Sequence, residues 1–169
     1  MSLLELTVVV CIIAVLVGVG LERLLRYQEL AEHTSMYNMV ATLRSAIHLR
    51  AAAYIATQQP GRIASLAEEN PFDWLAERPH NYAGVRYDPG IGELEPGTWY
   101  YDRKSGHLLY IPRSSRYFLA GKDGRKWVRF RVEYGEAPFP SGVSPNPLRE
   151  IRALGIQPIE RVNWFDDLK

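Results

Sequence analysis

The sequence predicts an α+β protein: one long N-terminal helix packed on a four-stranded antiparallel meander, followed by an extended, proline-rich C-terminal tail. Three observations predict this class. No proline precedes Pro60, apolar residues recur at spacings of three and four between residues 36 and 54, and residues 98–135 alternate short strand-forming runs with glycine-containing turns. With 169 residues and a formal net charge of +1, the chain fits one domain with an appendage and has no overall attraction to anionic partners.

The chain opens with the apolar run MSLLELTVVVCIIAVLVGVGL, which ends at Glu22 and Arg23. A membrane-spanning helix needs about 20 mostly apolar residues, and this run has that length. No basic residue precedes it and no small-residue cleavage site follows it, which argues against a removable signal peptide. As a plain anchor, the run would hold the following residues in the cytoplasm, because Arg23 and Arg26 lie on its C-terminal side. A basic leader removed ahead of Met1 would place them outside, and we favour that processed chain.

Glu5 is the one acidic residue inside this run. A charged carboxylate in a bilayer costs about 2.5–3.5 kcal/mol or more and normally has a partner. The nearest basic side chain along the chain is Arg23, so the nearest cation is the α-amino group of Met1, about 6 Å away along a helix axis. The partner is therefore the chain's own amine or that of a neighbouring copy. The alternative is a glutamate protonated in lipid or extended to the interface.

These residues carry a family resemblance. Met1, Ser2, Leu3, Leu4 and Glu5, followed by the apolar run, resemble the N-terminus of a mature type IV pilin or pseudopilin. The resemblance implies that a leader ending in glycine is removed by a prepilin peptidase, that Met1 is N-methylated, and that Glu5 neutralises the N-terminus of an adjacent subunit. It covers roughly the first 30 residues closely and the remainder only in architecture.

The resemblance also implies how the subunit is stored and assembled. The subunit would be anchored in the bacterial inner membrane and then polymerised with identical subunits into an extracellular or periplasmic filament by an assembly ATPase and a platform protein. Two departures stand out: many type IVa pilins have proline where this chain has Glu22, and many close a C-terminal loop with a disulfide. Cys11 is the lone cysteine here, so packing alone must hold the C-terminal region.

The helical pattern continues beyond the apolar run, which predicts one helix over about residues 2–57, roughly 80 Å long. Residues 1–25 are apolar on all sides and suit lipid or a bundle of like helices. Residues 26–57 are amphipathic and belong to a globular head, with Glu32, Arg44 and His48 expected off the apolar stripe. That stripe consists of Met36, Val40, Leu43, Ile47, Ala51 and Tyr54.

Gly18 and Gly20 alternate with valines and weaken the helix locally, since glycine costs about 1 kcal/mol relative to alanine. In lipid the segment is expected to be helical, because unsatisfied backbone groups are too costly there. In a filament we expect a break centred on these glycines, as the family resemblance also implies. The absence of proline at position 22 argues against the break.

After the helix, residues 58–97 read as an irregular connection with short helices, beginning at QQPG and including a turn at Asn70-Pro71. Residues 98–135 predict the sheet. Its expected strands are GTWYYD, HLLYIP, RYFLA and KWVRFRVEY, joined by turns at residues 103–106 and 121–125. The tail, residues 136–169, is expected to be extended, with one short helix from Pro147 to Leu154 ended by Gly155.

Between Asp102 and Glu133 the sequence has nine Lys or Arg residues and three acidic ones, with aromatic residues among them. Such a face suits DNA or an anionic surface, but a solvated sheet face, or pairing with the acidic segment 66–96 of the same or the next subunit, is the more ordinary arrangement. The candidate contacts are Lys122, Arg125, Lys126, Arg129 and Arg131.

No catalytic, metal or cofactor pattern emerges. Gly18-Val19-Gly20 lacks the third glycine of a dinucleotide fingerprint, and the four histidines lack the spacing of metal ligands. The sequence therefore predicts a structural subunit, not an enzyme, with no cofactor. Two alternatives stay open within the family, a type II secretion pseudopilin and a minor pilin. A membrane-anchored monomeric binding module is the alternative of a different class.

Overall fold

The structure is a computed structural model that describes residues 2–121, 123–135, 154–162 and 164–165. A single helix, α1, runs from Leu3 to Ala56, a length of about 81 Å. Ser2 caps its N-terminus, and at the other end the Thr57 amide donates to the Ala53 carbonyl at 3.0 Å. Gln58 then turns the chain away with a φ of 57°. The expected helix over about residues 2–57 is confirmed.

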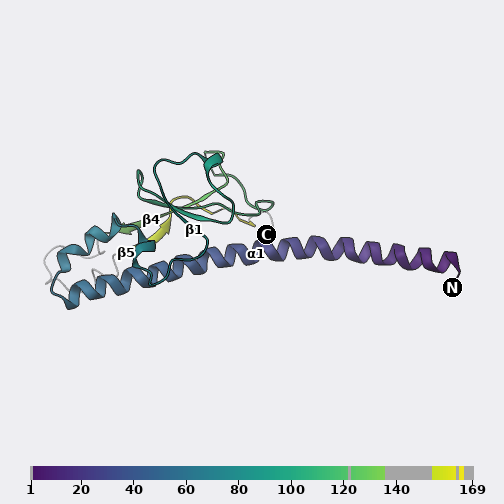
Figure 1. The fold of residues 1–169 in the computed structure, drawn as a ribbon, viewed down its shortest axis with the longest axis horizontal. Coiled ribbons are helices and arrows are strands. Elements are labelled where there is room, and N and C mark those ends of the chain that lie inside the picture. Colours follow the sequence, from purple (N-terminus) through teal and green to yellow (C-terminus); the bar gives the residue numbers. More distant parts are fainter. Residues whose placement is uncertain (1, 122, 136–153, 163, 166–169) are drawn as a thin grey trace.

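The two halves of α1 have different surroundings. Its first half projects alone, and the head packs along its second half (Figure 1). The head buries the predicted apolar stripe, as helical periodicity requires. The buried members are Met36, Val40, Leu43, Ile47, Ala51 and Tyr54.

The connection after α1 contains the expected short helices. Three 3-10 turns, η1 (Pro60–Arg62), η2 (Ala64–Ala67) and η3 (Pro71–Trp74), follow one another. The Asn70 side chain caps η3 by accepting from the Phe72 amide at 3.2 Å. Leu66 and Phe72 are buried, so this connection closes one end of the core.

The sheet has five strands in the order β1-β2-β3-β4-β5. β1 and β2 run parallel, with η4 (Ile91–Glu93) between them along the chain, and each later pair is antiparallel. The strands are β1 (Tyr82–Arg86), β2 (Trp99–Asp102), β3 (His107–Tyr110), β4 (Val128–Tyr134) and β5 (Leu154–Pro158).

The sheet therefore differs from the expected four-stranded antiparallel meander in its strand count and in the direction of one pair. β1 lies within residues 58–97, which the sequence predicted to be irregular. RYFLA forms no strand, and only Phe118 makes an isolated bridge, to Trp164. The reason is that the backbone amides of Arg113 and Ser114, before this run, and of Tyr117, inside it, donate to carboxylates on α1 instead of to a strand. At the expected turn, the Gly121 amide donates to the Arg125 carbonyl at 3.0 Å, so the two ends of the turn face each other.

The fifth strand comes from the tail. Gly155, expected to end a helix, instead pairs with Glu133 inside β5. Most of the expected helix from Pro147 to Leu154 lies outside the described residues, and Leu154 itself begins β5. As the edge strand, β5 is held by the helix: Arg44 Nη2 donates to the Ile156 carbonyl at 2.9 Å, and His48 Nε2 lies 3.2 Å from the Leu154 carbonyl. These contacts occupy backbone groups that an open sheet edge would leave free.

Side chains pack on both faces of the sheet. Trp99 of β2 and Phe130 of β4 face α1 and form the main core, with ring centroids 5.8 Å apart. Tyr100 points to the opposite face. It joins a smaller cluster there with Leu94, Leu109, Ile111 and Trp127. Since β2 is buried on both faces, the head's core is complete without the first half of α1.

Candidate functional site: the exposed helix and its junction with the head

The first half of α1 exposes its apolar side chains. Leu3 is 84% exposed and Leu16 is 66% exposed, and none of the helix's most apolar 18-residue window is buried. By length and composition this helix can cross a membrane. An apolar surface of this size on a folded head marks a place that lipid or protein covers.

Glu5 lies at the exposed start of this surface. Its backbone amide donates to Ser2 Oγ at 3.2 Å, so Ser2 and Glu5 occupy the first and last positions of a capping-box sequence. The spacing S-x-x-E signals this cap in the sequence, although the prediction for Glu5 did not include it. Within the described residues, Glu5 has no ion pair. Met1, the expected source of the partner amine, lies outside them.

Gly18 and Gly20 lie inside the unbroken α1 of this single chain. A Cβ atom added at either glycine would meet nothing within 4 Å. Packing within the described chain therefore gives no reason for either glycine, although each costs helix stability relative to alanine.

Where α1 meets the head, Glu29 is buried, with only 1% of its surface exposed. Three groups donate to its carboxylate, each at 3.0 Å: Trp164 Nε1–H, the Tyr117 amide and the Ser114 hydroxyl. These three donors are all neutral groups, and together they satisfy the buried carboxyl oxygens. Glu29 thereby ties α1 to residues 113–117 and to the C-terminal segment.

Glu32 repeats this arrangement one turn later. Its carboxylate accepts from the Tyr110 hydroxyl at 2.8 Å, the Arg113 amide at 2.5 Å and the Ser114 amide at 3.2 Å. Burial, together with this hydrogen bond to Glu32, raises the pKa of Tyr110 far above its ordinary value. The hydroxyl therefore stays a donor across the physiological pH range.

The expectation that Glu32 lies off the stripe is wrong, and Glu29 was not singled out. Both could have been found from the sequence. They lie four and seven residues before Met36, so they continue the head-facing side of the helix towards the N-terminus, Glu32 as a half-buried and Glu29 as a buried carboxylate.

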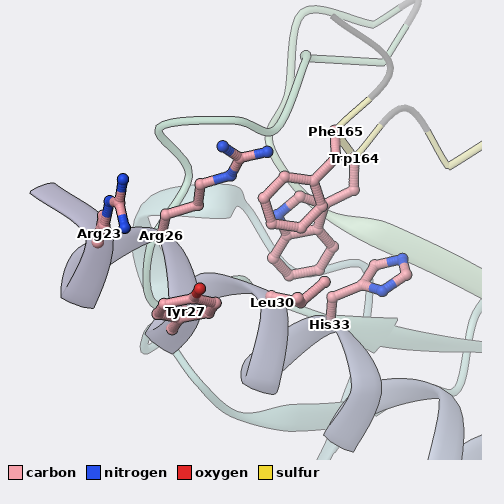
Figure 2. A pocket seen from close by; sticks show the side chains of 7 residues that line it. All are labelled: Arg23, Arg26, Tyr27, Leu30, His33, Trp164 and Phe165. Carbon is pink, nitrogen blue, oxygen red and sulfur yellow. The ribbon is translucent and has the colours of Figure 1, made fainter. Parts of the chain in front are cut away.

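An open groove of about 660 Å³ lies beside this junction (Figure 2). Side chains of α1 form one wall, and Trp164 and Phe165 form the other. The α1 residues that line it are Arg23, Arg26, Tyr27, Leu30 and His33. In the sequence Arg23 and Arg26 only indicate the orientation of the helix, since nothing there places residues 164–165 beside them.

The basic residues proposed as DNA or anion contacts do not form one free patch. Arg129 pairs with Glu160 and lies 3.8 Å from Asp123, and Arg131 pairs with Glu133 at 2.6 Å. Arg125 lies over the Trp127 ring, with its guanidinium carbon 4.8 Å from the ring centroid.

Of the other two candidates, Lys126 Nζ donates to the Ser115 carbonyl at 3.0 Å, and Lys122 lies outside the described residues. Among the ion pairs of the described residues, one makes the expected link to the acidic segment 66–96: Lys104 Nζ lies 2.5 Å from Asp88 Oδ2. Within the same residues no group of three or more His, Cys, Asp or Glu side chains could hold a metal ion.

The fold and the site define a class: a long helix, half of it apolar and exposed, joined to an α+β head. No protein-family model, curated protein or solved structure matches the chain.

Proposed function

We propose that this chain is a structural subunit that polymerises with identical copies into a type IV pilus-like filament through the apolar half of α1. The observation that carries the proposal is the complete core of the head beside an exposed apolar helix. Burying that helix is worth about 25 cal/mol for each Å² of apolar surface, so it needs either lipid or like helices around it. A subunit stored in the membrane and then transferred to a filament uses both environments in turn.

Glu5 supplies the assembly contact in this proposal. Beside a helix N-terminus a carboxylate gains about 0.3–1 kcal/mol from the helix dipole. Inside a bilayer a charged side chain costs at least about 2.5–3.5 kcal/mol. The capping position alone does not offset that cost, so a cation must. In the filament this cation is the α-amino group of a neighbouring subunit.

The family resemblance of residues 1–5 supports the same reading. It implies that Met1 is N-methylated and that the chain depends on a prepilin peptidase and a pilus assembly machinery. It also implies that the subunit is held in the bacterial inner membrane before export to the cell surface. The two glycines add support, because small residues allow neighbouring helices to approach closely. The chain has no enzymatic role or cofactor in this proposal.

The first test is to look for this chain in long filaments sheared from cells that express it. The second is Glu5→Ala expressed beside the wild-type subunit: we expect the variant to be inserted and processed but to enter filaments poorly. Filaments formed in wild-type numbers by Glu5→Ala subunits alone would show that the assembly role is wrong.

A matched pair of variants separates charge pairing from helix capping. Glu5→Gln removes the charge but keeps a side chain that suits the capping box, whereas Ser2→Ala removes the cap and keeps the charge. We expect Glu5→Gln to assemble poorly and Ser2→Ala to assemble nearly normally. The reverse order would assign Glu5 to the cap and remove the argument for pairing.

A further inference from the structure

We propose that the groove between α1 and the C-terminal segment binds an anionic phospholipid while the subunit is stored in the membrane. The lipid phosphate lies at Arg23 and Arg26, and the polar headgroup that follows it outward extends along the groove towards the aromatic wall. This inference rests on the membrane-stored state of the proposed function, and it adds a ligand site to that state.

The two arginines are placed for one phosphate. Spaced three residues apart, they lie on the same face of α1, with Cβ atoms about 5–6 Å apart. Both are exposed, and within the described residues neither has a hydrogen bond or an ion pair. Glu22, the acid beside them, makes no ion pair with either among the described contacts, and Glu29 is occupied by its own three donors.

Their depth matches the headgroup layer. Residues 3–21 form a span of about 28 Å, close to the roughly 30 Å of bilayer hydrocarbon. Arg23 and Arg26 then lie about 3 and 7.5 Å beyond Leu21 along the helix axis. The polar layer on each side of a bilayer is about 5–7 Å thick, so both guanidinium groups fall in or beside it.

The opposite wall lies farther from the bilayer than the two arginines, because Trp164 and Phe165 pack on His33, about 18 Å beyond Leu21 along the helix axis. Trp164 is nearly buried, and Phe165 lies against it and against Tyr117, with centroids 6.4 and 5.6 Å away. Phe165 adopts a φ of 65°, a conformation that non-glycine residues rarely adopt. Its amide is fixed by a 3.1 Å hydrogen bond to the Tyr117 carbonyl. The exposed Tyr27 completes the wall on α1 (Figure 2). Together these rings give the groove an apolar surface on the outer side of the two arginines.

An anionic lipid fits the groove better than a zwitterionic one or a soluble anion. Two unpartnered cations favour a net negative headgroup, because a zwitterionic lipid brings its own ammonium group to the same place. A soluble phosphate gains nothing from the apolar wall or from the adjacent hydrocarbon. Burial also lowers the pKa of His33, so this side chain adds no cation to the groove at neutral pH.

The test uses the full chain reconstituted in nanodiscs of phosphatidylcholine and phosphatidylglycerol, with native mass spectrometry to count the lipids retained per chain. We expect phosphatidylglycerol to be retained in preference. Arg23→Gln and Arg26→Gln should each lower that preference about fivefold, and the double variant should lower it by the product of the two single effects. The control is Arg103→Gln, at the exposed β2–β3 turn, which makes the same charge change and should leave the preference unaltered.

Two further arms make the result decisive. The first arm uses free glycerol phosphate, which the wild-type chain should retain no better than the double variant does. If the wild-type chain retained glycerol phosphate as well as phosphatidylglycerol, the site would not be a lipid site. Flotation with phosphatidylcholine vesicles tests membrane storage separately. A chain that floats but shows no arginine-dependent preference has no such site, while its membrane role stands. A chain that does not float overturns both.

Discussion

Trp164 Nε1–H donates to the carboxylate of Glu29 at 3.0 Å, a contact that joins α1 to the C-terminal segment across 135 residues. The same carboxylate holds the Tyr117 amide and the Ser114 hydroxyl, so one side chain fixes three segments. Because the head depends on this junction, the stability of the head can be tested separately from filament assembly.

Glu29→Ala should destabilise the head strongly. It leaves the buried donors of Trp164 and Tyr117 without their acceptor, and each unsatisfied group costs about 1–3 kcal/mol, so we expect a loss of about 3 kcal/mol in the free energy of unfolding. Glu29→Gln should lose less, since it keeps one acceptor oxygen. Urea unfolding measures both. Glu68→Ala, at an exposed position, is the control and should change stability by less than about 0.5 kcal/mol. Equal effects at the two positions would contradict the junction.

A fragment of residues 26–169 should be soluble, monomeric and folded. The buried side chains of α1 begin at Glu29, so the fragment keeps every helix contact of the core and removes the exposed apolar half. Gel filtration and circular dichroism would decide. An insoluble or unfolded product would show that the head needs the rest of the helix or neighbouring subunits.

The stability of this fragment should fall as the pH drops below about 6.5. Burial lowers the pKa of His33, and burial together with Arg131 and Arg129 lowers the pKa of His107. As the pH falls, both histidines therefore take up protons in the unfolded chain before they do so in the folded one. The stability that the neutral histidines contribute is fully present above their pKa in the unfolded chain. It is lost as the pH falls to their lower pKa in the folded chain.

Replacing both histidines by glutamine should flatten this pH dependence between pH 7 and 5. His80→Gln, at an exposed site, serves as the control. An unchanged slope in the double variant, measured by thermal unfolding at each pH, would assign the acid sensitivity to other groups.

The helix around Gly18 and Gly20 should break in the filament, although it is continuous in the single chain. Glycine weakens the helix by about 1 kcal/mol per position relative to alanine, and neighbouring helices can satisfy backbone groups that lipid cannot. Gly18→Ala with Gly20→Ala should resist the break and reduce assembly. A filament density map with unbroken i to i−4 hydrogen bonds from residue 12 to 26 would contradict this prediction. The double variant should then assemble normally.

The sequence alone determined the long helix, its apolar first half and its buried stripe from Met36 to Tyr54, because helical periodicity is a local property that repeats over many turns. It also determined β2, β3 and β4 approximately, since strand-forming runs and turn residues flank one another there. These features concern neighbours along the chain, where spacing determines which residues share a face.

Only the tertiary structure decided the rest. β5 forms because β4 offers it an open edge and because Arg44 and His48 hold its far side, and neither condition can be read from residues 154–158. RYFLA has the composition of a strand, but Glu29 and Glu32 hold the residues around it in another conformation. The groove joins residues 23–33 to residues 164–165, a pairing that depends on how the whole head is oriented on α1. Such contacts join segments that are distant along the chain. Their energies depend on tertiary packing, which cannot be read from the local sequence pattern.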